Sequence, residues 1–252
     1  MIKGLYSAFT ALQAAWRYQD VLSNNIANAN TPGFKREIAS QESFADVLLS
    51  RQTPIPAPLS VTIQQVIGQI GTGTFIADFA TDFQEGNFKP TGNELNMATS
   101  VGFFAIESGG GTRFYTRDGS FVRNSSGNLV NSEGYYVLDP SGGRINLPAD
   151  KVEVSQSGVI TSEDGAVHGT VGTFDFKPAD LTRAGQAFFT STTPGVVVSG
   201  GIRQGLLEES NTELLAEMTT MMAVQRTFQA NQTILARLDE NLNEAAGSLG
   251  RF

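Results

Sequence analysis

The sequence contains no cysteine and only one histidine, His168. Without cysteine the chain has no disulfide, no thiolate metal site and no cysteine nucleophile. The lone histidine has no nucleophile-elbow motif around it, so a Ser-His-Asp triad has no support. No histidine or cysteine pair offers the spacing of a zinc site. The sequence therefore suggests no metal, no cofactor and no catalytic residue, and we expect a protein that is not an enzyme.

Paired carboxylates could still perform chemistry, because a glycosidase needs only two of them. However, Asp118 lies in an expected turn, where an aspartate ordinarily bonds the backbone. Glu208 and Glu209 precede an expected helix, where acidic side chains complement the helix dipole. No pair of carboxylates is singled out by its position, so these residues leave the expectation unchanged.

Basic residues are also scarce, since 17 Lys and Arg face 25 Asp and Glu, for a net charge of −8. This balance argues against a nucleic-acid partner, which requires a basic surface to neutralise phosphates. No apolar run approaches the roughly 20 residues that a transmembrane helix needs. Lys3 is followed by an amphipathic segment rather than by the apolar core of a signal peptide. We expect a chain that is either cytoplasmic or exported without a cleaved leader.

The N-terminal segment predicts one helix over residues 3–29. Apolar side chains recur there at alternating spacings of three and four, a heptad seam that a helix buries against partner helices. The seam comprises Ile2, Leu5, Phe9, Leu12 and Trp16. Four asparagines follow, at Asn24, Asn25, Asn28 and Asn30. Asparagine is a poor residue for a helix interior, so their abundance indicates that these side chains have partners of their own.

The helix is expected to end at Thr31-Pro32-Gly33. Proline disfavours helical geometry in the residue before it, and Pro-Gly fits the centre of a type II turn. Phe34 supplies an apolar anchor after the turn, and Lys35 and Arg36 add charge. From Glu37 to Arg51 the pattern is mixed, with Phe44, Val47 and Leu48 at a spacing that allows a short helix. Thr53–Pro58 alternates with proline and must be extended.

The middle of the chain changes to a period of two, which is typical of β-strands. Phe75, Ala77 and Phe79 alternate with other residues, and Gly102–Ile106 reads as a buried strand. Asp118-Gly119, between Phe114–Arg117 and Ser120–Arg123, predicts a type I′ hairpin. Further turns at glycine follow every eight to twelve residues or so, as expected for an antiparallel sandwich or open barrel of short strands.

A second long helix is expected near the C-terminus. Ser210 or Asn211 could cap it, and it should run to Ala246 and end at Gly247. Its seam includes Leu214, Met218, Met221, Gln225, Phe228 and Leu235. Neither seam can be buried by one helix alone, so the simplest solution pairs the two ends of the chain. The predicted fold is α+β, a split α-helical coiled-coil domain formed by both termini, with an inserted antiparallel all-β domain. The expected divisions are residues 1–35 and 206–252 for the coiled coil, 36–68 for an extended connector and 69–205 for the β-domain.

Several stretches resemble the flagellar axial proteins, the rod and hook subunits of the bacterial flagellum. The N-terminal one is Leu22-Ser-Asn-Asn-Ile-Ala-Asn-Ala-Asn-Thr-Pro-Gly-Phe-Lys35, and the C-terminal one begins at Ser210-Asn211 and continues through Glu217-Met218, Gln225-Arg226, Phe228 and Asn231. Between them, Gln84–Phe88, Met97-Ala98, Gly102–Phe104 and Tyr115–Phe121 are similar to the family's β-domain. The matches occur in the family's order and cover nearly the whole chain.

The resemblance implies a basal-body rod subunit, proximal or distal, with no catalysis. Such a subunit would stack with copies of itself and with other rod and hook proteins into a hollow helical shaft between motor and hook. It would pass through the flagellar type III export apparatus without a cleaved signal peptide and end outside the cytoplasmic membrane, in the periplasm or cell-wall zone. The residues expected at the assembly interface are Leu5, Phe9, Leu12, Trp16, Asn24, Asn25, Asn28, Asn30, Phe34, Leu214, Met218, Met221, Gln225, Arg226, Phe228, Asn231 and Leu235.

One alternative belongs to another class. Helical ends on a β-rich centre also suit a soluble adhesin or carbohydrate-active protein that uses its helices to oligomerise. The two interpretations differ in what the ends do, because a rod subunit polymerises through them while the alternative forms a discrete oligomer.

Overall fold

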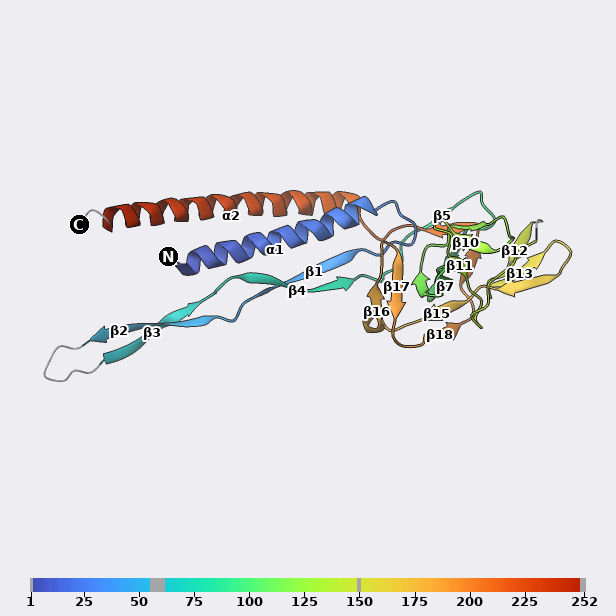
Figure 1. The fold of residues 1–252 in the computed structure, drawn as a ribbon, viewed down its shortest axis with the longest axis horizontal. Helices are drawn as coiled ribbons and strands as arrows, with labels where there is room; N and C mark the ends of the chain where they lie inside the picture. The colour runs from blue at the N-terminus through green and yellow to red at the C-terminus, as the bar shows by residue number, and fades with distance from the viewer. Residues whose placement is uncertain (1, 55–61, 149–150, 250–252) are drawn as a thin grey trace. The chain divides into compact units, whose positions relative to one another are not determined.

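The computed structural model of the protein describes residues 2–54, 62–148 and 151–249 (Figure 1). The chain forms two compact units. The helical unit contains the chain up to Asn24, Glu37–Ala80 and the chain from Leu215 onward. The β unit contains Asn25–Arg36 and Thr81–Leu214, so the chain passes between the units four times. Helices at both ends with a large antiparallel β region between them confirm the α+β prediction.

Helix α1, Ile2–Ala27, follows the N-terminal prediction closely and ends two residues before the predicted position 29. The side chains that it buries are mainly small. They are Ala8, Ala14, Ala15, Val21 and Leu22. The large aromatic residues of the predicted seam are not among the buried ones, since Phe9 and Trp16 are 56% and 58% exposed. The helix therefore uses one face within the chain and leaves a second, aromatic face uncovered.

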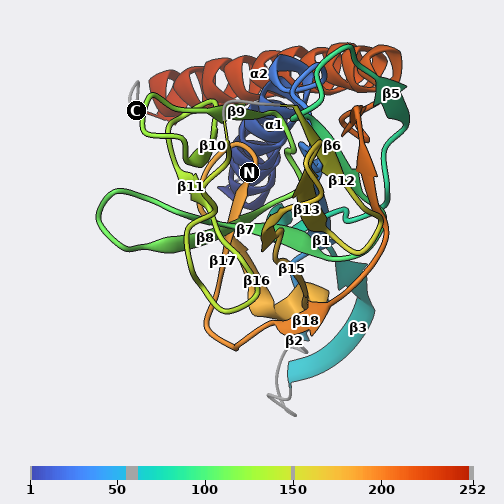
Figure 2. The same ribbon diagram turned by 90° about the vertical axis from the view of Figure 1, so that its right-hand side faces the viewer.

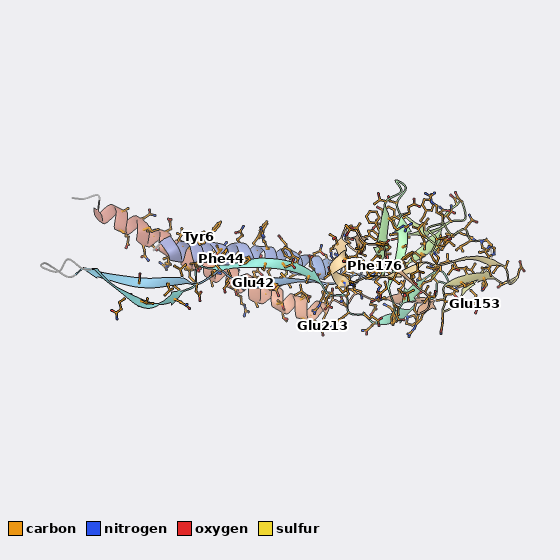
Figure 3. All side chains as sticks on the ribbon, turned by 90° about the horizontal axis from the view of Figure 1, so that it is seen from below. Tyr6, Glu42, Phe44, Glu153, Phe176 and Glu213 are labelled. Atoms are coloured by element: carbon orange, nitrogen blue, oxygen red, sulfur yellow. The ribbon has the colours of Figure 1, made fainter. Side chains whose placement is uncertain are left out.

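Helix α2, Leu214–Leu249, continues through Gly247, where the sequence predicted its end. In the helical unit α1 and α2 point in opposite directions (Figure 1), and Figure 3 shows them crossing rather than lying parallel. Gly4 of α1 faces Leu238 of α2, because a Cβ on Gly4 would lie 3.9 Å from Leu238 Cδ1.

The remaining part of the helical unit is a two-stranded ribbon. Its strands are β1 (Glu37–Ser43), β2 (Val47–Pro54), β3 (Thr62–Ile70) and β4 (Thr74–Thr81), with β1 paired to β4 and β2 to β3. The short helix that the spacing of Phe44, Val47 and Leu48 allowed is wrong, because Phe44 stacks on Phe75 across the ribbon with ring centroids 4.8 Å apart. Figure 3 labels Phe44 on the ribbon and Tyr6 on α1.

Two details of the ribbon bear on the sequence predictions. In β4 the buried side chain is Ile76, whereas Ala77 and Phe79 are exposed, so the segment is a strand as predicted but its burial does not alternate from residue to residue. Thr53 and Pro54 end β2 and are extended as predicted. The rest of the proline-rich run, residues 55–58, lies outside the described residues.

The β unit is built from short strands around a nine-stranded sheet, and Figure 2 shows this unit facing the viewer. Its order is β16-β17-β8-β7-β11-β10-β9, with β15 pairing both β7 and β18. These strands are β7 (Phe103–Glu107), β8 (Arg113–Thr116), β9 (Phe121–Arg123), β10 (Leu129–Asn131), β11 (Tyr136–Val137), β15 (Thr173–Asp175), β16 (Leu181–Arg183), β17 (Phe188–Ser191) and β18 (Val196–Val198).

Smaller sheets complete the unit. One has the order β12-β13-β14, and two pairs join β19 to β6 and β20 to β5. Their strands are β5 (Phe88–Pro90), β6 (Met97–Thr99), β12 (Val152–Val154), β13 (Val159–Ser162), β14 (Val167–Thr170), β19 (Ile202–Gln204) and β20 (Leu206–Glu208), and a 3₁₀ turn, η1, spans Pro178–Asp180. The pairing of β5 with β20 joins an early strand of the unit to its last one.

Strand β7 is buried, as the apolar run at Gly102–Ile106 predicted, and it pairs with β8, β11 and β15. Successive side chains of a strand point to opposite faces. Phe104 and Ile106 accordingly join one hydrophobic cluster, whereas Phe103 and Ala105 join a second. Because its first four residues are all apolar and buried, β7 has hydrophobic core on both of its faces.

The predicted hairpin at Asp118-Gly119 is wrong. Strand β8 pairs with β7 and β17, and β9 pairs with β10, so the strands on either side of the dipeptide do not pair with each other. Asp118 Oδ1 instead accepts the N–H and the hydroxyl of Ser120, at 2.9 and 2.6 Å. The predicted glycine turns are confirmed, because Gly127, Gly134, Gly142, Gly158 and Gly165 all have φ between 78° and 90°.

Candidate functional site

The Asn-rich stretch after α1 belongs to the β unit and forms a tight turn. The N–H of Phe34 donates to Thr31 O at 3.3 Å, and Gly33 between them has φ of 66°. A type II turn requires this positive φ at its third residue. The sequence prediction for Thr31-Pro32-Gly33 is therefore supported by both the hydrogen bond and the backbone angle.

The turn delivers Phe34 and Lys35 into the interior, where each is 0% exposed. The guanidinium of Arg183 lies 4.9 Å from the centroid of the Phe34 ring, and its Nη2 donates to Lys35 O. Phe34 is thus the anchor that the sequence predicted. Burial of the Lys35 ammonium was not predicted, because a lysine beside Arg36 reads as a solvated charge.

Lys35 meets a carboxylate from the other end of the chain. Its Nζ lies 2.6 Å from Glu208 Oε1 and also donates to Gln84 O at 2.5 Å. Glu208, on β20, is 0% exposed as well. Burial lowers the pKa of the Lys35 ammonium because it desolvates the charge, and the Glu208 carboxylate opposes this shift.

A second cation shares the same carboxylate. Arg117 Nη1 lies 3.3 Å from Glu208 Oε2 and donates to Thr99 O at 3.0 Å, with its side chain only 8% exposed. The N–H of Gly86 donates to Glu208 Oε1 at 3.0 Å. One buried carboxylate therefore serves two buried cations and a backbone N–H. We refer to Lys35, Arg117 and Glu208 as the buried triad.

Beside the triad, Asn211 and Arg36 form polar contacts that connect segments distant in the sequence. Asn211 Oδ1 accepts the N–H of Arg36 at 2.8 Å, and its Nδ2 donates to Asp82 O at 2.8 Å and to Gln84 O at 3.3 Å. Arg36 Nε lies 3.0 Å from Asp82 Oδ2. The predicted helix cap at Ser210 or Asn211 is wrong, because α2 begins at Leu214 and the Asn211 amide binds these three backbone groups instead.

The structure places the predicted interface residues in different environments. Buried ones are Asn25, Asn28 and Phe34; half-buried ones are Leu5, Leu12, Met221, Phe228, Asn231 and Leu235; exposed ones are Phe9, Trp16, Asn24, Asn30, Leu214, Met218, Gln225 and Arg226. Within the turn, Thr31 Oγ1 donates to Asn28 Oδ1 at 3.2 Å. The buried asparagine at position 28 thus has a partner in its own chain.

Sequence reasoning missed the buried triad altogether. Glu208 was read as an ordinary acidic residue before a helix, and Arg117 as part of a hairpin. Lys35 and Glu208 are 173 residues apart, and no periodicity joins them. The resemblance to a known family, which included Lys35 among its matching residues, was the one signal that pointed at this position.

The described residues offer little else that suggests chemistry. Among them no three acidic or histidine side chains gather as a metal site would need. His168 lies half-buried on β14. Of the helices in the described part of the chain, none has a stretch that is long and apolar enough to cross a membrane.

Comparison with known proteins agrees with this picture of helical ends around a β region. The family "Flagella basal body rod protein" matches residues 5–35, "Flagellar hook protein FlgE/F/G D1 domain" matches 99–162, and "Flagellar basal body rod FlgEFG protein C-terminal" matches 203–247. These matches contain all three members of the buried triad, since Lys35 closes the first, Arg117 lies in the second and Glu208 in the third.

Full-length relatives give the same result. The chain is 31% identical to the flagellar basal-body rod protein FlgG of Bacillus subtilis, over 97% of this chain and 98% of that protein. It is 31% identical to the flagellar basal-body rod protein FlgF of Caulobacter vibrioides, over the whole of both. The chain belongs to the flagellar basal-body rod proteins. It is a structural subunit of the rod of the bacterial flagellum.

Proposed function

We propose that this subunit assembles helically, with copies of itself and with other rod and hook proteins, into the hollow shaft between motor and hook. The terminal helices make the contacts in this proposal, in the manner of a coiled coil shared between subunits. The role is purely structural, without a catalytic step or a cofactor. A head-to-tail contact that does not close on itself produces such a filament.

The observation that carries this proposal is the uncovered apolar face of the helices. On α1, Tyr6, Phe9 and Trp16 are more than half exposed, at 53%, 56% and 58%. On α2, Leu215 is 77% exposed and Met222 53%. Large aromatic and aliphatic side chains left exposed on a helix favour a contact with another protein surface. Burial of Trp and Tyr dominates the energy of such contacts.

The ribbon of the helical unit gives independent support. Leu48 on β2 and Val66 and Ile67 on β3 are 62%, 62% and 61% exposed. An isolated pair of strands is marginally stable in water and needs a packing surface to become firm. Neighbouring subunits would provide that surface in the assembled rod.

The predicted interface residues divide into two roles under this proposal. Exposed side chains such as Phe9, Trp16 and Met218 contact neighbouring subunits directly. The buried Asn25, Asn28 and Phe34 act from inside the chain by holding the turn after α1 in one conformation. The asparagines that meet another subunit's surface, in addition to contacts within their own chain, are the two exposed ones, Asn24 and Asn30.

The test compares Trp16→Ala with Arg17→Ala in the full chain. Arg17 is the next residue on α1, is also exposed, and serves as the matched control. Trp16→Ala should leave the urea midpoint of the monomer nearly unchanged, because the side chain is mostly exposed already. It should reduce rod assembly in cells lacking the native chain by at least tenfold, whereas Arg17→Ala should have little effect. Normal rods and normal swimming with both Phe9 and Trp16 replaced by Ala would overturn the proposal.

We also propose that the subunit resides outside the cytoplasmic membrane, in the periplasm or cell-wall zone, and reaches it through the flagellar export apparatus without cleavage. Membership of the rod family supports this location, because the rod continues outward from the motor. Mass spectrometry of the protein recovered from basal bodies tests it. An N-terminal peptide that begins within the first few residues is expected, and a mature N-terminus tens of residues downstream would contradict it.

A further inference from the structure

The buried triad contains an imbalance of charge. Lys35 and Arg117 are both cationic and nearly inaccessible to water, and within the described part of the chain Glu208 is the one carboxylate that touches them. Glu85 also acts electrostatically on Lys35, but it is exposed and lies outside the triad. A buried charge without a partner is strongly unfavourable. Glu208 is therefore the group on which the burial of both cations depends.

Glu208 is carried by a strand that arrives late in the chain. Strand β20 pairs with β5 through Leu206–Pro90, Leu207–Lys89 and Glu208–Phe88. Lys35 and Arg117 precede Glu208 by 173 and 91 positions. As long as β20 is not paired with β5, Lys35 and Arg117 lack the carboxylate of Glu208.

The backbone links the same strand to the turn after α1. The N–H of Gly33 donates to Glu208 O at 2.8 Å, and the N–H of Glu209 donates to Asn87 O at 2.8 Å. The side chain of Glu208 also holds the N–H of Gly86. Release of β20 would consequently break bonds to the turn, to the segment before β5 and to both cations in a single event.

We propose that Glu208 is an electrostatic latch that holds together the segments of the β unit around the buried triad. With β20 docked, the turn at Gly33, the Gly86 segment and Arg117 are held together. When β20 is released, these three parts separate together, because burial of two cations without a carboxylate is unfavourable. The N-terminal and C-terminal segments of the β unit thus form one two-state element, and the unit cannot close until the last strand has arrived.

A double-mutant cycle distinguishes a latch from ordinary packing. Glu208→Gln leaves two unpaired cations, and we expect the equilibrium constant for unfolding of the full chain to rise at least a hundredfold. Lys35→Met alone leaves the balanced pair of Arg117 and Glu208, so its effect should be smaller. In the Glu208→Gln background, Lys35→Met should reverse sign and raise the urea midpoint, since it removes an unpaired buried charge.

Glu209→Gln is the matched control. Glu209 is the adjacent residue, and its half-exposed side chain lies 3.6 Å from the Nζ of the exposed Lys89. Because exposed ion pairs contribute little, this variant should change the unfolding constant less than threefold. Equal effects of Glu208→Gln and Glu209→Gln, or a Lys35→Met effect of the same sign in both backgrounds, would overturn the proposal.

Native-state hydrogen exchange of the unmodified full chain tests the latch even if Glu208→Gln fails to fold. The amides of Gly33, Gly86 and Glu209 should exchange with protection factors within about threefold of one another, as members of one opening unit do. Exchange at Gly33 more than tenfold faster than at Glu209 would show that the turn opens without release of β20, and the proposal would be wrong.

Discussion

A Cβ atom on Gly33 would lie 2.2 Å from the backbone nitrogen of Asp118. The same atom would lie 2.3 Å from the carbonyl carbon of Arg117. The turn after α1 therefore packs directly against the backbone that presents Arg117 to Glu208. No other residue type allows this approach, because the φ of 66° at Gly33 also disfavours any side chain.

Gly33→Ala should accordingly be among the most damaging single substitutions in the β unit. The positive φ and the backbone overlap together predict a loss of about 2–5 kcal/mol in the free energy of unfolding. Urea denaturation of the full chain measures it. Gly134→Ala is the control, since Gly134 has φ of 85° but no heavy atom within 4 Å of the position that a Cβ would take. It should cost only about 1 kcal/mol. Equal losses would mean that the turn can move away from Asp118.

Asn211→Ala should destabilise the β unit by about 1–3 kcal/mol. The substitution leaves the N–H of Arg36 and the carbonyl of Asp82 without their partner, and unpaired polar groups carry this cost. Thermal or urea unfolding provides the value. Asn243→Ala on the exposed surface of α2 is the control and should change stability by less than about 0.5 kcal/mol. A loss no greater than the control would show that water replaces these bonds without penalty.

Asp118→Asn should raise the urea midpoint at pH 7. Burial raises the pKa of the Asp118 carboxyl above its ordinary value of 3.8, although the hydrogen bonds from Ser120 oppose the shift. The ionised group is therefore less favourable in the folded protein than in the unfolded chain, and asparagine removes that penalty while keeping an acceptor for Ser120.

The sign of the pH dependence follows from linkage. As the pH falls through the folded-state pKa toward 3.8, the folded wild type binds a proton before the unfolded chain does and gains stability. The advantage of Asp118→Asn should hence shrink over that window. Asp118→Ala, which lacks the acceptor, should be destabilising at both ends of it. An advantage that is constant with pH would contradict the assignment.

Gly73→Ala should disturb the helical unit. A Cβ on Gly73 would lie 2.2 Å from Thr10 Oγ1 of α1, and the residue has φ of 134°. We expect a loss of about 1–3 kcal/mol together with faster hydrogen exchange at Phe44, whose N–H donates to Gly73 O at 3.0 Å. Gly71→Ala, where the nearest atom is Asp46 Oδ1 at 3.7 Å, should have little effect. Unchanged exchange at Phe44 in Gly73→Ala would show that the ribbon shifts without opening.

Local patterns were sufficient for much of the fold. The three-and-four spacing predicted both α1 and α2, and the unbroken apolar run predicted β7. Pro32-Gly33 predicted its turn because those two residues restrict the backbone wherever they occur. These features depend on neighbours within a few positions, and a sequence displays such neighbours directly.

The errors arise where a distant segment competes with a local one. Asp118-Gly119 has the composition of a hairpin turn, but β8 finds partners in β7 and β17 rather than in β9. Asparagine is a common helix-cap residue, but the side-chain amide of Asn211 hydrogen-bonds the backbone of Arg36 and Asp82 instead. For a helix cap the local preference is worth about 1 kcal/mol, and several tertiary hydrogen bonds together can outweigh it.

The sequence by itself determined the helical ends, the β-rich centre and, through its resemblance to flagellar axial proteins, the family. Only the tertiary structure decided that Lys35 is buried and that Glu208 pairs with both Lys35 and Arg117. Periodicity reports which face of an element is apolar, and a charged residue carries no such mark of the partner it will meet. The energy of a buried ion pair depends on the few ångströms that separate its atoms, and folding alone brings residues 35 and 208 to that distance.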